Sequence, residues 1–149
     1  IILNKTSNNT CDISAEYSKL VNITLKKNDA MPLIDEFPIL SIAAACGQGK
    51  MSMKGLGELK FKESDRFLAI KEGLKKCGVE VNTTGEDMQI IGSKKIKGEA
   101  KIDAKNDHRI AMSFNILSLI AEKKIRVIGN NSITTSFPEF FYTLNSLFK

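Results

Sequence analysis

The chain has 149 residues, of which 42% are hydrophobic and 26% are charged. This balance can bury a core and lies outside the composition of disordered chains. The formal net charge is +5, but the lysines are dispersed and tryptophan is absent, which disfavours nucleic-acid binding. No run of about 18 apolar residues is present, so neither a membrane-spanning helix nor a membrane partner is predicted.

Hydrophobic periodicity predicts alternating strands and helices along the whole chain. In chain order, the expected elements are strands at 13–19 and 21–26, a helix at 35–46, a strand at 51–54, a helix at 63–77, a hairpin of strands 79–83 and 88–91 that turns through Gly85, a strand at 100–103, a helix at 107–122, a strand at 124–128 and a helix at 137–148. The order is strand, helix, strand, helix, strand, strand, followed by most of the same order again.

The predicted helices are of two kinds. Residues 39–46 and 110–121 are apolar on nearly every side, which is typical of a helix without a solvated face. The helices at 63–77 and 137–148 each carry a single apolar stripe and are expected at the flank. We therefore predict an α/β fold with helices buried inside and sheets outside, which reverses the usual layering.

Equivalent residues recur at an offset of about 72 positions, which indicates a duplicated supersecondary unit. The pairs are Asp35 and Asp107 at helix starts, Gly57 and Gly129 at strand ends, and Ser64 and Ser136 before the second helix of each unit. The prediction is a single domain over residues 1–149. It contains a first βαβαββ unit at about 20–92 and a second unit at about 99–149.

Two short charged clusters, at residues 62–66 and 106–109, each come directly before an apolar helical run. A helix N-terminus presents unpaired N–H groups and a partial positive charge. The chain has nineteen lysines and three arginines, and two of the arginines, Arg66 and Arg109, lie in these clusters. A guanidinium can bind a carboxylate or phosphate through two parallel hydrogen bonds. The clusters predict one kind of anion site used twice, although each alone also fits an ordinary capping turn.

Four stretches resemble the enolpyruvyl transferase family, most closely the branch whose acceptor is shikimate 3-phosphate. They read IDEFPIL at residues 34–40, GELKFKESDR at 57–66, DHRIAMS at 107–113 and TSFPEF at 135–140, in the family's order and spacing. The resemblance implies two domains joined by a hinge, each an inside-out α/β barrel of three βαβαββ units. The chain begins with Ile1 rather than Met, and we expect it to be the C-terminal part of a two-domain enzyme.

The reaction that the resemblance implies transfers the enolpyruvyl group of phosphoenolpyruvate to the 5-hydroxyl of shikimate 3-phosphate and releases phosphate. It proceeds by addition and elimination and uses no metal or organic cofactor. It requires a group that accepts the hydroxyl proton, an acid that protonates the methylene carbon, and cations that hold a carboxylate and two phosphates.

The resemblance assigns roles to six residues. Asp35 and Glu63 are implied to be catalytic, Asp35 as the acceptor of the hydroxyl proton and Glu63 as the acid. Asp35 and Lys62 are implied to bind shikimate 3-phosphate, and Asp35 also fits an N-cap for its helix. Arg66, Arg109 and His108 are implied to bind phosphoenolpyruvate, although a lone histidine also fits a structural role.

One residue departs from the family pattern. Many members carry lysine where this chain has Thr135, and that lysine contributes to the phosphoenolpyruvate site. A branch of the family reads Thr-Ser-Phe-Pro as this chain does. We interpret the threonine as a mark of that branch.

Three further functions stay open at this stage. One is transfer to UDP-N-acetylglucosamine by the related enzyme of cell-wall synthesis, and another is a remnant of the fold without catalysis. Nucleic-acid binding through a related fold ranks below both. The preferred interpretation predicts that the chain is inactive alone, needs the missing N-terminal part as its partner, and belongs to an enzyme that is a monomer.

The cysteines bear on the compartment. Cys11, Cys46 and Cys77 are odd in number, widely spaced and free of any CxxC pattern. Neither a disulfide framework nor a zinc site is predicted, and a reducing compartment, the cytoplasm, fits best.

Overall fold

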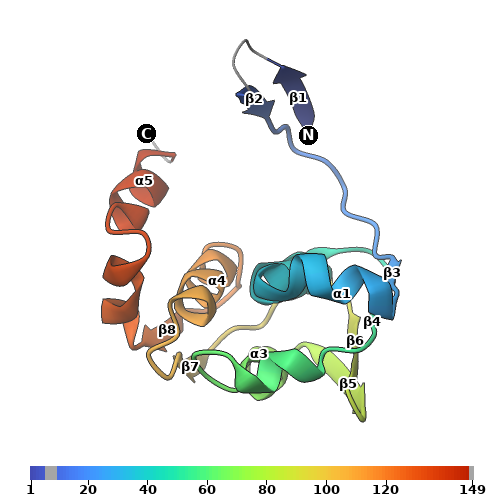
Figure 1. Ribbon diagram of the computed structural model, residues 1–149. Helices are drawn as coiled ribbons and strands as arrows, with labels where there is room; N and C mark the ends of the chain where they lie inside the picture. The colour runs from blue at the N-terminus through green and yellow to red at the C-terminus, as the bar shows by residue number, and fades with distance from the viewer. Residues whose placement is uncertain (6–9, 148–149) are drawn as a thin grey trace.

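The computed structural model describes residues 1–5 and 10–147 (Figure 1). The elements are β1 (Ile2–Lys5), β2 (Cys11–Ser14), β3 (Thr24–Leu25), α1 (Lys27–Leu33), the 3-10 turn η1 (Ile34–Glu36), α2 (Phe37–Cys46), β4 (Lys50–Met53), η2 (Gly57–Phe61), α3 (Arg66–Lys76), β5 (Glu80–Thr84), β6 (Asp87–Ile91), β7 (Ala100–Asp103), α4 (His108–Ser118), β8 (Ile125–Ile128), η3 (Asn130–Thr135) and α5 (Phe140–Ser146). With α1 to α2 counted as one helical segment, β3 to β6 follow the order βαβαββ and β7 to α5 the order βαβα.

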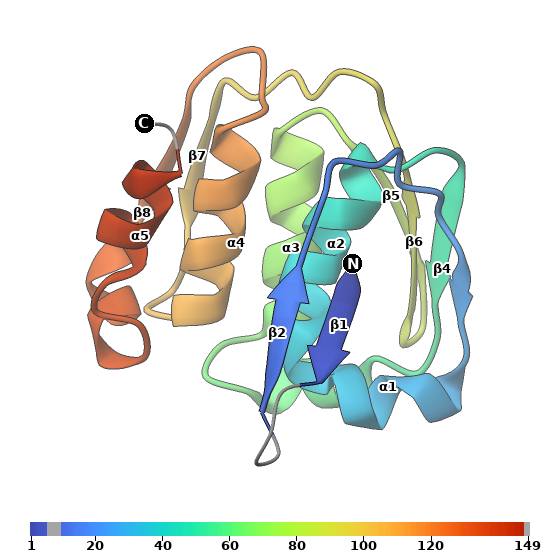
Figure 2. The same cartoon turned by 90° about the horizontal axis from the view of Figure 1, so that it is seen from above.

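The helices α2 and α4 pack against each other at the centre, and sheets cover their outer sides (Figure 2). The sheet of order β3-β4-β6-β5 contacts α2 and α3, while the parallel pair β7-β8 contacts α4 and α3. The predicted layering, helices inside and sheets outside, is confirmed. The strands in the described ranges form three separate sheets, with the antiparallel pair β1-β2 as the third, and they do not close into a barrel.

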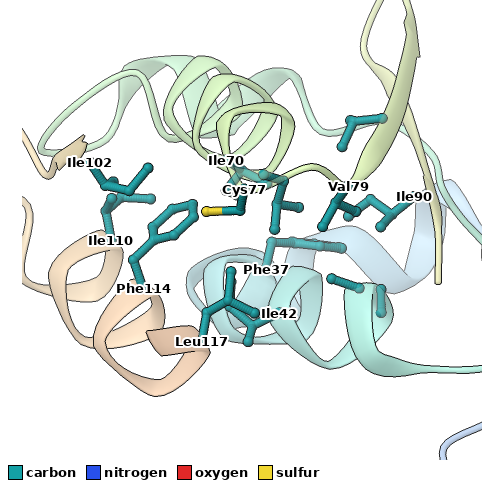
Figure 3. Close-up of a cluster of buried hydrophobic side chains, with 14 of the residues drawn as sticks. Phe37, Ile42, Ile70, Cys77, Val79, Ile90, Ile102, Ile110, Phe114 and Leu117 are labelled. Carbon is teal, nitrogen blue, oxygen red and sulfur yellow. The ribbon is translucent and has the colours of Figure 1, made fainter. Parts of the chain in front are cut away.

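The core lies where α2, α3 and α4 meet. Phe114 points from α4 toward Cys77 at the end of α3, and Leu117 faces Ile42 of α2 (Figure 3). All four side chains are at most 3% exposed. Burying a side chain of the Leu, Ile or Phe size stabilises a fold by about 1.5–3 kcal/mol. This packing holds α3 and α4 side by side, and the two charged clusters lie at the N-terminal ends of these helices.

The predicted helices form, but with different bounds. The helix predicted at 107–122 ends at Ser118, because the N–H groups of Glu122 and Lys123 donate to the carbonyls of Ile96 and Lys97 and turn the chain toward the strand pair. The last helix begins at Phe140 rather than 137, after the turn η3 that the pattern did not predict. The final residue of that prediction, 148, lies outside the described residues.

The largest differences from the prediction lie near the N-terminus. The strand predicted at 13–19 forms only at residues 13 and 14: β2 ends at Ser14, and residues 15–20 are neither helix nor strand, with Tyr17 94% exposed. Apolar and polar residues alternate in that stretch, but the core of this chain does not cover the apolar ones. The helix α1 was not predicted, since it is short and contains Pro32, which opposes helix formation.

Several large apolar side chains stay exposed. They include Ile2, Leu3 and Ile13 of the β1-β2 hairpin, each more than half exposed, and Ile39 of α2, which is 39% exposed. The prediction of central helices without any solvated face is therefore only partly met, because one stripe of α2 remains uncovered. Of the helices in the described part, none has the length and apolarity needed to cross a bilayer.

Two buried serines occupy equivalent places on the central helices and differ in their hydrogen bonds. Ser113 of α4 donates to the carbonyl oxygen of Arg109 at 2.7 Å. The hydroxyl of Ser41 on α2 is 1% exposed and has no hydrogen-bond partner among residues 1–5 and 10–147. An unpaired buried hydroxyl costs free energy that a paired one does not.

Replacing Ser41 with alanine is therefore expected to raise the free energy of unfolding by about 1 kcal/mol, because the change removes the unpaired group and favours the helix. The matched variant Ser113→Ala loses a hydrogen bond and is expected to be neutral or destabilising. Urea titration of both variants measures the difference. Equal changes in the two variants would show that the Ser41 hydroxyl is satisfied in solution.

Candidate active site

A buried guanidinium lies at the centre of the candidate site. Arg66, the first residue of α3, is 1% exposed and faces three carboxylates. Its Nε donates to Oδ2 of Asp107 at 2.8 Å, its Nη1 to Oδ1 of Asp35 at 3.0 Å, and its Nη2 to Oε2 of Glu63. A guanidinium has five N–H groups, so these bonds use three of them.

Segments far apart in the sequence bring these groups together. The turn η1 presents Asp35, the bend between η2 and α3 presents Lys62 and Glu63, and the start of α4 presents Arg109. The bend is short because Asp65 begins α3: its Oδ1 accepts the N–H of Leu68 at 2.8 Å. The side chains of Asp35 and Glu63 are 46% and 52% exposed, whereas Arg66 lies beneath them.

Asp35 is the best connected of the exposed carboxylates. Its Oδ1 lies 3.2 Å from the Nζ of Lys62 as well as 3.0 Å from Arg66. Desolvation acts to raise the pKa of the Asp35 carboxyl, but the hydrogen bond and charge of Lys62, with the charges of Arg109 and Arg66, hold that pKa below its usual value. Asp35 is therefore ionised at neutral pH. It does not cap α2 as an alternative predicted, since the N-cap is Glu36 and no side chain bonds there.

Asp107 joins the two charged clusters and is 0% exposed. Its Oδ1 accepts the N–H groups of Arg109 and Ile110 and so caps α4, while its Oδ2 accepts from Arg66 and from the hydroxyl of Ser64. Burial acts to raise the pKa of the Asp107 carboxyl, but the hydrogen bond and charge of Arg66, the Ser64 hydroxyl and the helix N–H hold it below its usual value.

The lowered pKa makes stability depend on pH. Since the pKa of Asp107 is lower in the folded chain than in the unfolded chain, its contribution is present above the unfolded value of about 3.9 and is lost as pH falls through the folded pKa. Replacing Asp107 with asparagine is expected to reduce the slope of unfolding free energy against pH below about pH 4, by at most about 1.4 kcal/mol per pH unit. Urea titrations from about pH 2 to about pH 6, the range over which carboxylates titrate, measure the slope. An unchanged slope would contradict the assignment.

Arg109 lies at the mouth of a pocket. Its Nη1 donates to the backbone oxygen of Asp35 and to Oε1 of Glu36, both at 2.9 Å. Behind it, a cavity of about 390 Å³ opens between α2, α4 and the start of α5. Its apolar walls are Pro38, Ile39, Met112, Ile116, Phe137 and Phe140. One nitrogen of the Arg109 guanidinium, Nη1, is thus held by the protein, and the side chain is 32% exposed.

The predicted helix-terminal anion sites are already occupied by the protein's own carboxylates. Asp65 caps α3 by accepting the N–H of Leu68, and Asp107 caps α4 by accepting the N–H groups of Arg109 and Ile110, so these donors are not available to an added anion. The cluster as a whole holds three cations, Lys62 and the two arginines, against four carboxylates, at Asp35, Glu36, Glu63 and Asp107. Counted by formal charge, these seven side chains carry one excess negative charge. An added anion could bind here only through N–H groups of the arginines or lysine, and with further positive charge nearby.

The structure places five of the six predicted site residues next to one another. Asp35, Lys62, Glu63, Arg66 and Arg109 form one connected network, centred on Asp35 and Arg66. His108 is half-buried beside Arg109, and its ring makes no hydrogen bond or ion pair with any described residue. Thr135, where many family members carry lysine, is exposed at the end of η3 and donates to the Ser132 carbonyl.

Sequence reasoning missed two partners of the arginines. It treated Asp107 only as a cap and did not single out Glu36. The sequence contains no local signal for the contact of Asp107 with Arg66, because the two residues are 41 positions apart. No cluster of three or more His, Cys, Asp or Glu within the described ranges is arranged to hold a metal ion.

Solved structures share this architecture. An EPSP synthase from Acinetobacter baumannii superposes with a TM-score of 0.80 at 36% identity, over 86% of this chain and 30% of that one. The enolpyruvyl transferase NikO from Streptomyces tendae has a TM-score of 0.66 at 13% identity over 98% of this chain, which is a likeness of fold alone. The fold is that of the enolpyruvyl transferases, as the motifs predicted.

Sequence comparison identifies the family to which the chain belongs among proteins of this fold. The family model of EPSP synthase (3-phosphoshikimate 1-carboxyvinyltransferase) matches residues 3–144, and the chain belongs to this family. Curated relatives named 3-phosphoshikimate 1-carboxyvinyltransferase are 40% identical in Persephonella marina, over 98% of this chain, and 41% identical in Petrotoga mobilis, over 94%. The chain spans about a third of the length of these relatives, 34% and 33% respectively.

Proposed function

We propose that this chain supplies one face of the active site of a 3-phosphoshikimate 1-carboxyvinyltransferase, an enzyme of aromatic amino acid biosynthesis. The observation that carries the proposal is the network of Asp35, Lys62, Glu63, Arg66 and Arg109, which three separate family motifs contribute. Asp35 lies in the first of these motifs, and residues of the other two, up to 74 positions away in sequence, contact it. The reaction joins phosphoenolpyruvate to the 5-hydroxyl of shikimate 3-phosphate.

In the proposed addition step, the 5-hydroxyl oxygen bonds to C2 of phosphoenolpyruvate while a proton adds to C3. Asp35 accepts the hydroxyl proton; its ionised state at neutral pH, its 46% exposure and its contact with Lys62 support this role. Glu63 donates the proton to C3 from the exposed side of Arg66. In the elimination step C3 returns a proton to Glu63 and the C2–O bond to phosphate breaks, which leaves the enolpyruvyl ether. The departing phosphate takes the proton that Asp35 accepted, so both carboxyl groups return to their starting states.

The cations have separate proposed tasks. Arg109 holds phosphoenolpyruvate through the N–H groups that Asp35 and Glu36 leave free, and Arg66 contributes its two remaining N–H groups from below. Lys62, which is 27% exposed, binds shikimate 3-phosphate together with Asp35. His108 stays a proposed phosphoenolpyruvate contact on the strength of its position beside Arg109 alone.

The rest of the enzyme is proposed to complete the site. Two substrates with several negative charges cannot bind tightly to a cluster that already has excess negative charge, so cations must come from outside this chain. The uncovered apolar stripe around Ile39 and the exposed β1-β2 hairpin suit contact with that remaining part. Closure of both parts over the substrates would exclude water and fix their orientation.

Reconstitution tests the proposal. The chain is joined in frame to the preceding two thirds of the Persephonella marina relative, and phosphate release is measured with phosphoenolpyruvate and shikimate 3-phosphate. The joined enzyme is expected to turn over with shikimate 3-phosphate, and the isolated chain is expected to show no turnover. Phosphate release only with UDP-N-acetylglucosamine would assign the chain to the other branch, and no release with either acceptor from a folded protein would favour a remnant without catalysis.

We also propose the compartment and the oligomeric state of the enzyme. The three cysteines are free; Cys77 is buried, Cys46 is half-buried and Cys11 is exposed, and thiols that form no disulfide suit a reducing cytoplasm. A monomer is proposed, with the remaining two thirds of the same polypeptide as the protein partner.

A further inference from the structure

The carboxylate of Asp107 is saturated by contacts within the protein. Oδ1 accepts the N–H of Arg109 at 3.0 Å and of Ile110 at 3.3 Å, while Oδ2 accepts Nε of Arg66 at 2.8 Å and Oγ of Ser64 at 3.0 Å. A carboxylate offers about four acceptor sites, so none is left for a substrate. Because Asp107 is also 0% exposed, it can act only through the groups that it holds.

The backbone before Asp107 is held in an uncommon conformation. Lys105 and Asn106 have φ values of 52° and 58°, in the left-handed region that residues other than glycine seldom adopt. Two hydrogen bonds fix the turn: the N–H of Lys105 donates to Asp103, and the N–H of Asp107 donates to the carbonyl of Ala104. The chain thus accepts an unfavourable backbone in order to place this carboxylate between α3 and α4.

The contact with Nε determines how Arg66 is oriented. The guanidinium is planar, so fixing its Nε–H on Asp107 sets the directions of both Nη groups. They then face Asp35 and Glu63, the two proposed catalytic carboxylates. The other oxygen of Asp107 holds the first turn of α4, which carries Arg109. The Asp107 carboxylate therefore fixes the position of Arg66 relative to the helix turn that carries Arg109.

We propose that Asp107 is a positioning residue, which sets the distance and orientation between Arg66 and Arg109 for the binding of phosphoenolpyruvate. The inference rests on the proposed function, and it adds the residue through which the two arginine motifs act as one site. It predicts that loss of the Asp107 charge disturbs the arginines even when α4 stays capped.

Asparagine separates the two tasks of Asp107, because it caps a helix about as well as aspartate but has only one oxygen. In Asp107→Asn the oxygen can cap α4, and the amide N–H₂ then faces Arg66. The matched control is Asp65→Asn, the same change at the exposed cap of α3, whose side chain makes no hydrogen bond or ion pair with an arginine among the described residues.

The first measurement needs no activity. The chain has three arginines, so its arginine Nε–H NMR spectrum contains three signals, which Arg66→Lys and Arg126→Lys assign. The Arg66 signal is expected to exchange with water at least about tenfold more slowly than that of exposed Arg126. Asp107→Asn is expected to remove this protection and Asp65→Asn to preserve it.

The second measurement uses the joined enzyme. Asp107→Asn is expected to lower kcat/KM for phosphoenolpyruvate by about 10–100-fold, the usual effect of removing a partner that orients a binding group, with a smaller change in KM for shikimate 3-phosphate. Ser64→Ala is expected to act in the same direction but more weakly, and Asp65→Asn to leave both constants unchanged.

The results separate this inference from the proposed function. Retained protection of Arg66 in Asp107→Asn, or kinetic constants per folded molecule equal to those of the parent, would overturn the positioning role. If the parent enzyme transfers nothing to shikimate 3-phosphate, the proposed function fails. Loss of Arg66 protection in Asp107→Asn would then still support Asp107 as the residue that orients Arg66.

Discussion

Replacing Arg66 with methionine is expected to lower the free energy of unfolding by about 3–5 kcal/mol, because the change leaves the buried Asp107 carboxylate without its charge partner. Methionine retains most of the apolar volume of the arginine stem, so the loss reports on the ion pair rather than on a cavity. Urea or thermal unfolding of the chain followed by circular dichroism measures the change.

A matched control comes from the third arginine. Arg126 is exposed on β8, and Arg126→Met is expected to change stability by less than about 0.5 kcal/mol. The double variant Arg66→Met with Asp107→Asn is expected to recover part of the loss, because no unpaired charge then remains buried. A loss below about 1 kcal/mol in Arg66→Met would mean that solvent reaches Asp107 in solution.

Replacing Glu63 with glutamine in the joined enzyme is expected to lower kcat by about 10²–10⁴-fold, the range for loss of a general acid. Glutamine keeps the length of the side chain and an oxygen that can accept from Nη2 of Arg66, so the fold and the guanidinium stay in place. The same change should suppress exchange of the methylene hydrogens of phosphoenolpyruvate with solvent. Phosphate release and deuterium incorporation measure the two effects.

The control for this prediction is Glu58→Gln, an exposed glutamate in η2 outside the network, which is expected to leave kcat unchanged. If Glu63→Gln retained parental kcat and solvent exchange, another group would have to protonate the methylene carbon. Loss of kcat in both variants alike would indicate a change in folding rather than in chemistry.

Much of the architecture could be predicted from the sequence because its signals are local. The apolar helices at 39–46 and 110–121 and the hairpin around Gly85 follow from periodicity and turn chemistry over a few residues. The prediction failed at residues 15–19, where alternation indicated a strand. Periodicity reports only which face could be buried, and nothing in this chain covers that face.

The same limit applies to the site. The motifs predicted which residues gather, and five of the six lie in one network, but they predicted open guanidinium groups ready for an anion. In the folded chain the carboxylates of Asp35, Glu63 and Asp107 surround Arg66. The pairing of Arg66 with Asp107 joins residues 41 positions apart, and no local pattern encodes such a contact.

The sequence by itself determined the family, the central helices and the residue types of the site, since these depend on side-chain chemistry and short-range spacing. Only the tertiary structure decided which charges are buried, which oppose each other and which face the pocket. The physical reason is that the strength of a charge interaction depends on distance and on exclusion of water. Both quantities are set by the packing of α2, α3 and α4 against one another.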